Sequence, residues 1–189
     1  MGQPGTKEEI MAHILVVHGS PRKGGNSQMM ADAFAEGARE AGNEVSMVDI
    51  GHSKIAGCLA CEYCFKHDGE CVQKDDMQDL YPLLRECDTL VYAIPMYNYT
   101  WPAQIKAFMD RMFCGMAKPF DVKRTALLCC FEDKDPTTAD GLVASYRILA
   151  RYCKWENLGE VLVNAVYEKG AIAGNPGLEK ARQLGASIS

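Results

Sequence analysis

Short apolar runs alternate with amphipathic stretches along this chain of 189 residues. The first run, residues 14–17 (ILVV), has the unbroken apolar character of a parallel strand that is buried on both faces. The same reading predicts further strands at residues 44–50, 89–94, 125–131 and 160–166, and helices at residues 29–41, 75–86, 103–113, 137–153 and 176–185. Strands that alternate with helices in this way predict an α/β fold with an open parallel sheet covered on both faces.

The loop after the first strand, residues 19–27 (GSPRKGGNS), combines glycines, hydroxyl groups and basic side chains. Gly24 and Gly25 allow a tight turn, and Asn26 is the predicted N-cap of the next helix. Backbone amides and the positive end of a helix dipole would meet there, which predicts a phosphate site. Gly25, not lysine, follows the G-x-x-x-x-G spacing, and G-x-G-x-x-G is absent, so a P-loop is excluded and a dinucleotide site is disfavoured. The loop suits a single phosphomonoester, and an ordinary strand-to-helix turn is the alternative.

Loops that follow parallel strands lie along one edge of the sheet, where ligands bind. We therefore expect residues 19–27, 57–71, 95–102 and 131–136 to share one rim. The loop after the third strand (PMYNYTWP) carries Met96, Tyr97, Tyr99 and Trp101, which could form the flat apolar wall that a flavin ring needs. Taken alone, these side chains could equally cap the core, but the position of the loop after the third strand favours the flavin ring.

Four cysteines fall within one short segment, as Cys58-x2-Cys61-x2-Cys64-x6-Cys71. The C-x2-C-x2-C run resembles the first three ligands of a bacterial ferredoxin cluster, with Cys71 as the fourth, and so predicts a [4Fe–4S] site. Zinc fits less well, because structural zinc pairs two C-x2-C knuckles that lie far apart, and free thiols are a further alternative. His67 lies within the segment and could replace a ligand, although an exposed loop histidine is the simpler interpretation.

Composition sets the broad class of the protein. Hydrophobic residues make up 48% and charged residues 24%, as in ordinary globular proteins, and the length suits one domain, residues 1–189, with a flexible tail at 1–11 and a cysteine-rich insertion at 51–74. A net charge of −5 argues against nucleic acid or an acidic membrane as partner. No apolar run reaches the ~20 residues of a membrane span. Nine cysteines without a secretory signal indicate a reducing compartment, so we expect a cytoplasmic location.

Two segments carry a resemblance to a known family. GSPRKGGNS after the first strand and PMYNYTWPAQIKAFMDR after the third resemble the NAD(P)H-dependent FMN reductase and iron–sulfur flavoprotein group of flavodoxin-like proteins, over residues 14–111. The resemblance implies a three-layer sandwich with a five-stranded parallel sheet of order 2-1-3-4-5. It implies that the FMN phosphate lies at Ser20, Arg22, Gly25, Asn26 and Ser27, and the isoalloxazine at Pro95, Met96, Tyr97 and Asn98. Phe131 and Glu132, after the fourth strand, match by topology alone.

The resemblance also implies an activity. FMN would take hydride from NAD(P)H, and electrons would pass to a small acceptor such as a flavin or a quinone, or through the cluster to a small-molecule or protein acceptor. Because the flavin ring performs the redox chemistry, no acid–base catalytic residue is predicted. A homodimer or homotetramer is expected, since reductases of this group often build flavin sites at subunit interfaces. The alternatives are a non-enzymatic carrier of the flavodoxin type and a zinc-bearing interaction module without flavin.

Overall fold

The computed structural model describes residues 11–188, and all of the predicted tail except Met11 lies outside this range. Its centre is a five-stranded parallel sheet in the order β2-β1-β3-β4-β5, which confirms the predicted fold. The strands are β1 (His13–His18), β2 (Glu44–Asp49), β3 (Thr89–Pro95), β4 (Arg124–Cys130) and β5 (Glu156–Val163). The α-helices are α1 (Asn26–Glu40), α2 (Tyr63–Lys66), α3 (Met77–Glu86), α4 (Ala103–Arg111), α5 (Asp140–Cys153) and α6 (Pro176–Ala186). Short 3₁₀ helices are η1 (Ile50–His52), η2 (Met112–Met116) and η3 (Pro136–Ala139).

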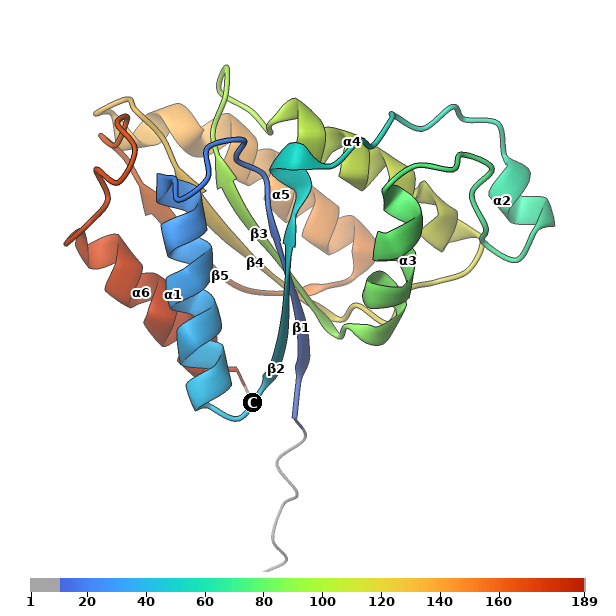
Figure 1. Cartoon of the computed structure of the whole chain (residues 1–189), viewed down its shortest axis with the longest axis horizontal. Helices are drawn as coiled ribbons and strands as arrows, with labels where there is room; N and C mark the ends of the chain where they lie inside the picture. Colours follow the sequence, from blue (N-terminus) through green and yellow to red (C-terminus); the bar gives the residue numbers. More distant parts are fainter. Residues whose placement is uncertain (1–10, 189) are drawn as a thin grey trace, which may run out of the picture.

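The sheet is covered on both faces (Figure 1). Helices α1 and α6 lie on one face, and α3, α4 and α5 lie on the other. The alternation of β1 explains this arrangement, because Ile14 and Val16 pack in the core under α1 and α6, whereas Leu15 and Val17 pack in the core under the other helices. None of the helices within residues 11–188 is both long and apolar enough to cross a bilayer.

Helices α1 and α6 touch backbone to backbone. A Cβ atom added at Gly37 would lie 2.0 Å from the carbonyl oxygen of Arg182, and one added at Gly185 would lie 2.1 Å from that of Phe34. Only glycine allows such an approach, so these two positions hold the C-terminal helix against α1. This contact helps to place the segment that precedes α6 beside the loop that precedes α1.

Several observed boundaries differ from the prediction by a few residues, and two of the differences have a clear physical cause. Strand β5 runs from Glu156 to Val163 and not over residues 160–166. β5 lies at the edge of the sheet, and its polar first half pairs with β4 through the backbone while the side chains of that half face solvent. A search for apolar runs misses such a half-strand. The N-cap of α1 is Gly25 and not Asn26, because the Asn26 side chain is engaged elsewhere. A third difference is the short helix α2 within the cysteine-rich segment, which the sequence did not predict.

Candidate functional site

The loops that follow β1, β3, β4 and β5 line one pocket at the carboxyl edge of the sheet. Most of the predicted cofactor-binding residues line it together: Ser20, Arg22, Asn26, Ser27, Pro95, Met96, Tyr97, Phe131 and Glu132. Cys130, Val166, Tyr167 and Lys169 also line it, and the sequence analysis did not single them out for this site. Of the four segments expected at one rim, residues 57–71 do not line this pocket. The same topological argument applies to the loop after the fifth strand, so it could have identified Val166, Tyr167 and Lys169.

The loop after β1 is closed by hydrogen bonds of its own. The amide of Arg22 donates to Ser20 Oγ (3.1 Å), and the amide of Gly25 donates to the carbonyl oxygen of Arg22 (2.9 Å). Gly24 adopts a φ of 64°, in the left-handed region that favours glycine. The chain therefore turns tightly at this point and delivers the N-terminus of α1 to the pocket.

The hydroxyl of Ser27 has no hydrogen-bond partner among the described residues. Ser27 is only 1% exposed, and it lies in the first turn of α1 and lines the pocket. A buried hydroxyl without a partner is unusual, because it keeps the full cost of its desolvation. At a helix N-terminus, where backbone N–H groups and the helix dipole favour negative charge, such a hydroxyl fits an anionic oxygen of a ligand.

Two other predicted phosphate ligands connect the loop to the segment after β5. Asn26 Nδ2 donates to the carbonyl oxygen of Glu168 (3.0 Å), and Asn26 Oδ1 accepts from the amide of Ile172 (3.3 Å). Arg22 Nη1 donates to the carbonyl oxygen of Tyr167 (2.9 Å), with its guanidinium 5.2 Å from the centre of the Tyr167 ring. Both side chains thus hold this segment over the pocket.

The loop after β3 is a tight turn. Tyr97 and Thr100 exchange two backbone hydrogen bonds, and the residues between them, Asn98 and Tyr99, have φ values of 46° and 63°. Positive φ at both central positions is the signature of a type I′ turn, for which asparagine is well suited. Asn98 lies at the tip of this turn and does not line the pocket, so its contact with a flavin ring stays a prediction.

Trp101 does not form part of the pocket wall. It is 6% exposed, its Nε1 donates to Ser145 Oγ (3.2 Å), and its ring packs edge-on against Tyr92 at a centroid distance of 5.3 Å. The alternative that these aromatics cap the core is therefore correct for Trp101, whereas Tyr99 is exposed. Met96 and Tyr97 remain as the side chains of this loop that line the pocket.

The four cysteines of the predicted cluster motif line a second, separate pocket: Cys58, Cys61, Cys64 and Cys71. All four are free thiols. Burial raises the pKa of the Cys64 thiol, and negative charge on Cys71 and Cys58 would raise it further, so these sulfurs lie within electrostatic reach of one another. No three potential ligands among residues 11–188 converge closely enough to hold a metal ion, so the cysteines share a pocket without forming a preassembled site.

The backbone of the cysteine-rich segment turns sharply between the cysteines. Ala60, Glu62 and Asp68 have positive φ values although none of them is glycine. Such conformations cost energy and cluster at binding sites, where the surrounding structure holds them. His67 lies outside the pocket: its Nδ1 contacts the carbonyl oxygen of Tyr63 (2.8 Å), and its ring is stacked on Tyr63 (3.5 Å between centroids). His67 is exposed, which agrees with the simpler interpretation of this residue.

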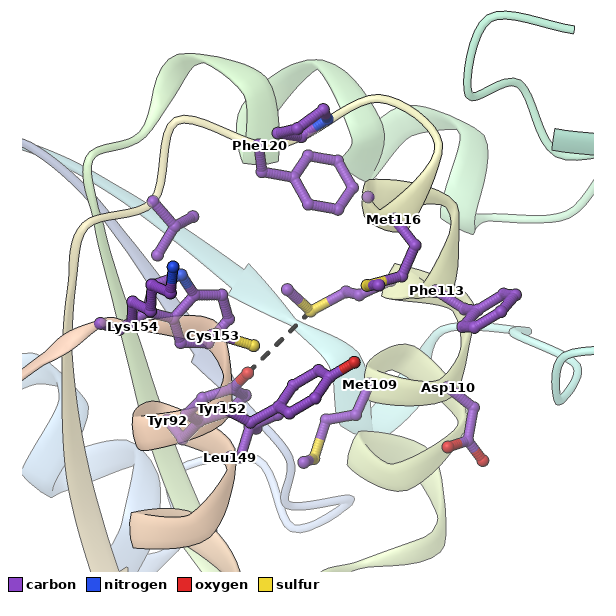
Figure 2. A pocket seen from close by; sticks show the side chains of 15 residues that line it. Tyr92, Met109, Asp110, Phe113, Met116, Phe120, Leu149, Tyr152, Cys153 and Lys154 are labelled. Atoms are coloured by element: carbon purple, nitrogen blue, oxygen red, sulfur yellow. Dashed lines mark hydrogen bonds between the residues drawn. The ribbon is translucent and has the colours of Figure 1, made fainter. Parts of the chain in front are cut away.

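A larger apolar cavity of about 660 Å³ shares no lining residue with the pocket at the carboxyl edge of the sheet (Figure 2). Val122 lies two residues before β4 and Trp155 directly before β5, and both line the cavity, so it lies toward the amino ends of these strands. The Tyr92 hydroxyl donates to Met112 Sδ (3.9 Å) across it. Phe113 lines both this cavity and the cysteine pocket, so the two are neighbours.

Comparison with known proteins finds curated relatives over about half of this chain. An iron–sulfur flavoprotein from Archaeoglobus fulgidus is 45% identical over 94 residues, which are 50% of this chain and 42% of that protein. An iron–sulfur flavoprotein from Methanosarcina thermophila is 39% identical over 110 residues, 58% of this chain and 57% of that protein. The matched regions thus span about half the length of these curated relatives.

Solved structures share the fold across nearly the whole chain. An NAD(P)H:quinone oxidoreductase from Methanothermobacter marburgensis superposes with a TM-score of 0.75 at 18% identity, covering 95% of this chain and 96% of that one. An FMN-dependent NADH-azoreductase from Bacillus anthracis, solved with FMN, superposes with a TM-score of 0.69 at 11% identity, covering 93% and 98%. The sequence model of one family, described as NADPH-dependent FMN reductase, matches residues 12–140, which include all of the predicted phosphate, ring and cysteine segments. The chain therefore belongs to the NADPH-dependent FMN reductase family.

Proposed function

We propose that the protein is an FMN-containing NAD(P)H oxidoreductase and that FMN binds in the pocket at the carboxyl edge of the sheet. One observation carries this proposal: the loops predicted for a phosphate and for a flavin ring line the same pocket, where the buried Ser27 hydroxyl has no hydrogen-bond partner within residues 11–188. Family membership supports it, as do an NADH-azoreductase of the same fold solved with FMN and a quinone oxidoreductase of that fold.

The pocket residues divide into two groups under this proposal. Ser27 and the N-terminus of α1 would receive the phosphate, and Arg22 and Lys169 would supply positive charge. Lys169 lies beside the loop, because a Cβ atom added at Gly24 would be 3.7 Å from its Nζ. Met96 and Tyr97 would flank the ring, next to Pro95, Phe131 and Glu132. Bound FMN would accept a hydride from NAD(P)H and release electrons to an acceptor. The chain's own contribution is to bind and orient the cofactor, which is why no acid–base residue is assigned.

We further propose that Cys58, Cys61, Cys64 and Cys71 hold a [4Fe–4S] cluster, through which electrons leave to a small-molecule or protein acceptor. The donor set fits, because four thiols with cluster spacing line one pocket and strained backbone positions lie between them. The names of the curated relatives support the assignment. The cysteines would need to move closer together on binding iron, since no three of them converge closely enough to hold a metal ion in this structure.

The test is to purify the protein anaerobically, record its visible spectrum, and measure FMN, iron and acid-labile sulfide per chain. Oxidation of NADH and NADPH is then followed with added flavin, a quinone and ferricyanide as acceptors. Flavin bands with NAD(P)H turnover support the oxidoreductase, and about four irons per chain support the cluster. Failure to bind FMN refutes the first proposal, and bound FMN without NAD(P)H turnover indicates an electron carrier. Absence of iron after anaerobic reconstitution refutes the second proposal alone.

Two further properties follow as proposals. Free thiols throughout the described chain suit a reducing compartment, so we propose a cytoplasmic location. The exposed Tyr97 and Tyr99 beside the pocket suit a second subunit that completes the flavin site, so we propose a homodimer or homotetramer. Light scattering of the FMN-loaded protein tests the second point, and a monomer at micromolar concentration contradicts it.

A further inference from the structure

The pocket lined by the four cysteines also contains a buried cation. Arg111 is the last residue of α4 and lines this pocket, and its side chain is completely shielded from solvent. A guanidinium carries five N–H donors, and without water each of them needs an acceptor within the protein. We therefore account for each nitrogen of the Arg111 guanidinium in turn.

One nitrogen of Arg111 fastens the cysteine-rich segment to α4. Nη1 donates to Asp75 Oδ2 (2.6 Å) and to the carbonyl oxygen of Ala56 (3.1 Å), and the Ala56 amide donates to the same carboxylate oxygen (3.0 Å). Ala56 lies just before the first cysteine and Asp75 just after the last, so this contact holds both ends of the segment. Burial opposes the positive charge, but the hydrogen bond to Asp75 keeps the pKa of Arg111 above its usual value.

The other two nitrogens of the guanidinium are unaccounted for. Nε and Nη2 are buried, and neither has a hydrogen-bond partner within residues 11–188. Buried donors without acceptors are rare in folded proteins, because nothing compensates for their lost hydration. Holding the ends of the segment uses Nη1 alone, so this structural role leaves the three remaining N–H groups unexplained.

Two kinds of acceptor lie near these nitrogens. One is the Tyr81 hydroxyl, which donates to the Arg111 carbonyl oxygen (3.3 Å) and also acts on the guanidinium, and the other is the cysteine sulfur of the pocket. Cys71 is close enough that its negative charge would stabilise the Arg111 cation. Neutral thiols accept hydrogen bonds weakly, whereas thiolates and sulfides bound to iron carry negative charge and accept them well. Hydrogen bonds to cluster sulfur favour the reduced state, which carries one more negative charge, and so raise the reduction potential.

We propose that Arg111 is a positioning residue of the iron–sulfur site, donating N–H groups from Nε and Nη2 to cluster sulfur and thereby raising the reduction potential of the cluster; this inference rests on the cluster proposed above. Lysine at this position would keep the charge and the bond to Asp75 but would lack the planar fork that presents the other donors. Arg111→Lys is therefore the variant of choice. Arg147→Lys is its matched control, because Arg147 forms a two-point ion pair with Glu160 and does not line the cysteine pocket.

The experiment is an anaerobic redox titration of the holoprotein, with the reduced cluster followed by electron paramagnetic resonance and its iron–sulfur stretches by resonance Raman spectroscopy. For Arg111→Lys we expect FMN content as in the wild type, shifted iron–sulfur stretches, and a lower cluster potential. A tenfold change in the one-electron equilibrium corresponds to a shift of about 59 mV. Arg147→Lys should match the wild type in every readout.

Each outcome has a distinct meaning. A wild-type protein that binds FMN but no iron overturns the proposed cluster. An Arg111→Lys cluster with wild-type potential and Raman bands overturns the role of Arg111 and leaves the cluster intact. If Arg111→Lys loses its iron, the variant Asp75→Asn distinguishes a role toward the cluster from a structural role, because it disturbs the ion pair while keeping the guanidinium. A cluster retained at wild-type potential in Asp75→Asn supports the proposal, and loss of iron there too reduces Arg111 to its structural contact.

Discussion

Replacing Ser27 by alanine separates the binding role of this residue from any structural one. The Ser27 hydroxyl is buried and has no hydrogen-bond partner in the part of the chain that the structure describes, and such a group costs about 1–3 kcal/mol in the folded protein. Ser27→Ala without cofactor should therefore be at least as stable as the wild type. With FMN, the variant loses one hydrogen bond to a charged phosphate, worth about 1.5–3 kcal/mol. At 1.36 kcal/mol per factor of ten, the dissociation constant should rise about 10- to 150-fold.

The neighbouring serine provides the matched comparison. Ser20 Oγ already accepts a hydrogen bond from the Arg22 amide, so Ser20→Ala should lose about 0.5–1.5 kcal/mol of stability even without FMN. For a chain of this size, 1 kcal/mol corresponds to a decrease of about 2–4 °C in the melting temperature. The assay is thermal unfolding of the two apo variants, together with titration of each with FMN by fluorescence quenching. A Ser27→Ala variant that is less stable than the apo wild type, or that binds FMN with unchanged affinity, refutes the reasoning.

Three further predictions concern other parts of the molecule. Asn26→Ala removes the two bonds to the segment after β5, so we expect stability to fall by about 1–3 kcal/mol and FMN to dissociate faster, as measured by unfolding and stopped-flow fluorescence. Cys64→Ala should abolish iron binding while FMN stays bound, whereas Cys153→Ala, outside the cysteine pocket, should keep iron; equal iron contents would contradict the ligand assignment. Burial raises the pKa of Asp88, but hydrogen bonds from Thr89, Arg124 and the His13 amide bring it below its usual value. A carboxylate whose pKa is depressed in the folded state contributes stability that is fully present above its unfolded pKa of ~3.9 and is lost as the pH falls through its folded pKa. In Asp88→Asn the loss of stability with falling pH should therefore be less steep, as measured by acid unfolding.

The fold could be read from the sequence because its strands differ so clearly from its helices. The run at β1 and the run at β4 are apolar on both faces, which in a chain of alternating elements indicates a buried parallel sheet. The sequence then placed residues 57–71 and the loops after β1, β3 and β4 at one edge by topology. The structure brings the loops after β1, β3 and β4 to one pocket, whereas the cysteines of residues 57–71 line another. Edge strand β5 was displaced in the prediction because one of its halves is polar and half-exposed.

Side-chain partners were harder to predict than positions. Asn26 was expected to cap α1, because asparagine before a helix usually does so. Its amide is instead held by Glu168 and Ile172, more than 140 residues away along the chain, and no local pattern records such a contact. Trp101 was a candidate for the pocket wall, yet its indole N–H finds Ser145 on α5 and its ring lies in the core. Both differences arise because tertiary contacts, not local propensity, decide where a polar side chain points.

Helix α4 contains both a contact that the sequence predicts and one that it does not. Lys106 and Asp110, four residues apart, form the exposed ion pair that their spacing predicts. Arg111 follows Ile105 and Phe108 at helical spacing, so it falls on the stripe that these buried residues define. A charge on an apolar stripe is costly and needs a partner, and the spacing alone could have marked Arg111 as unusual. Only the structure adds that the partners are Asp75 and Ala56, at the two ends of the cysteine-rich segment, and that two nitrogens remain for the pocket between them.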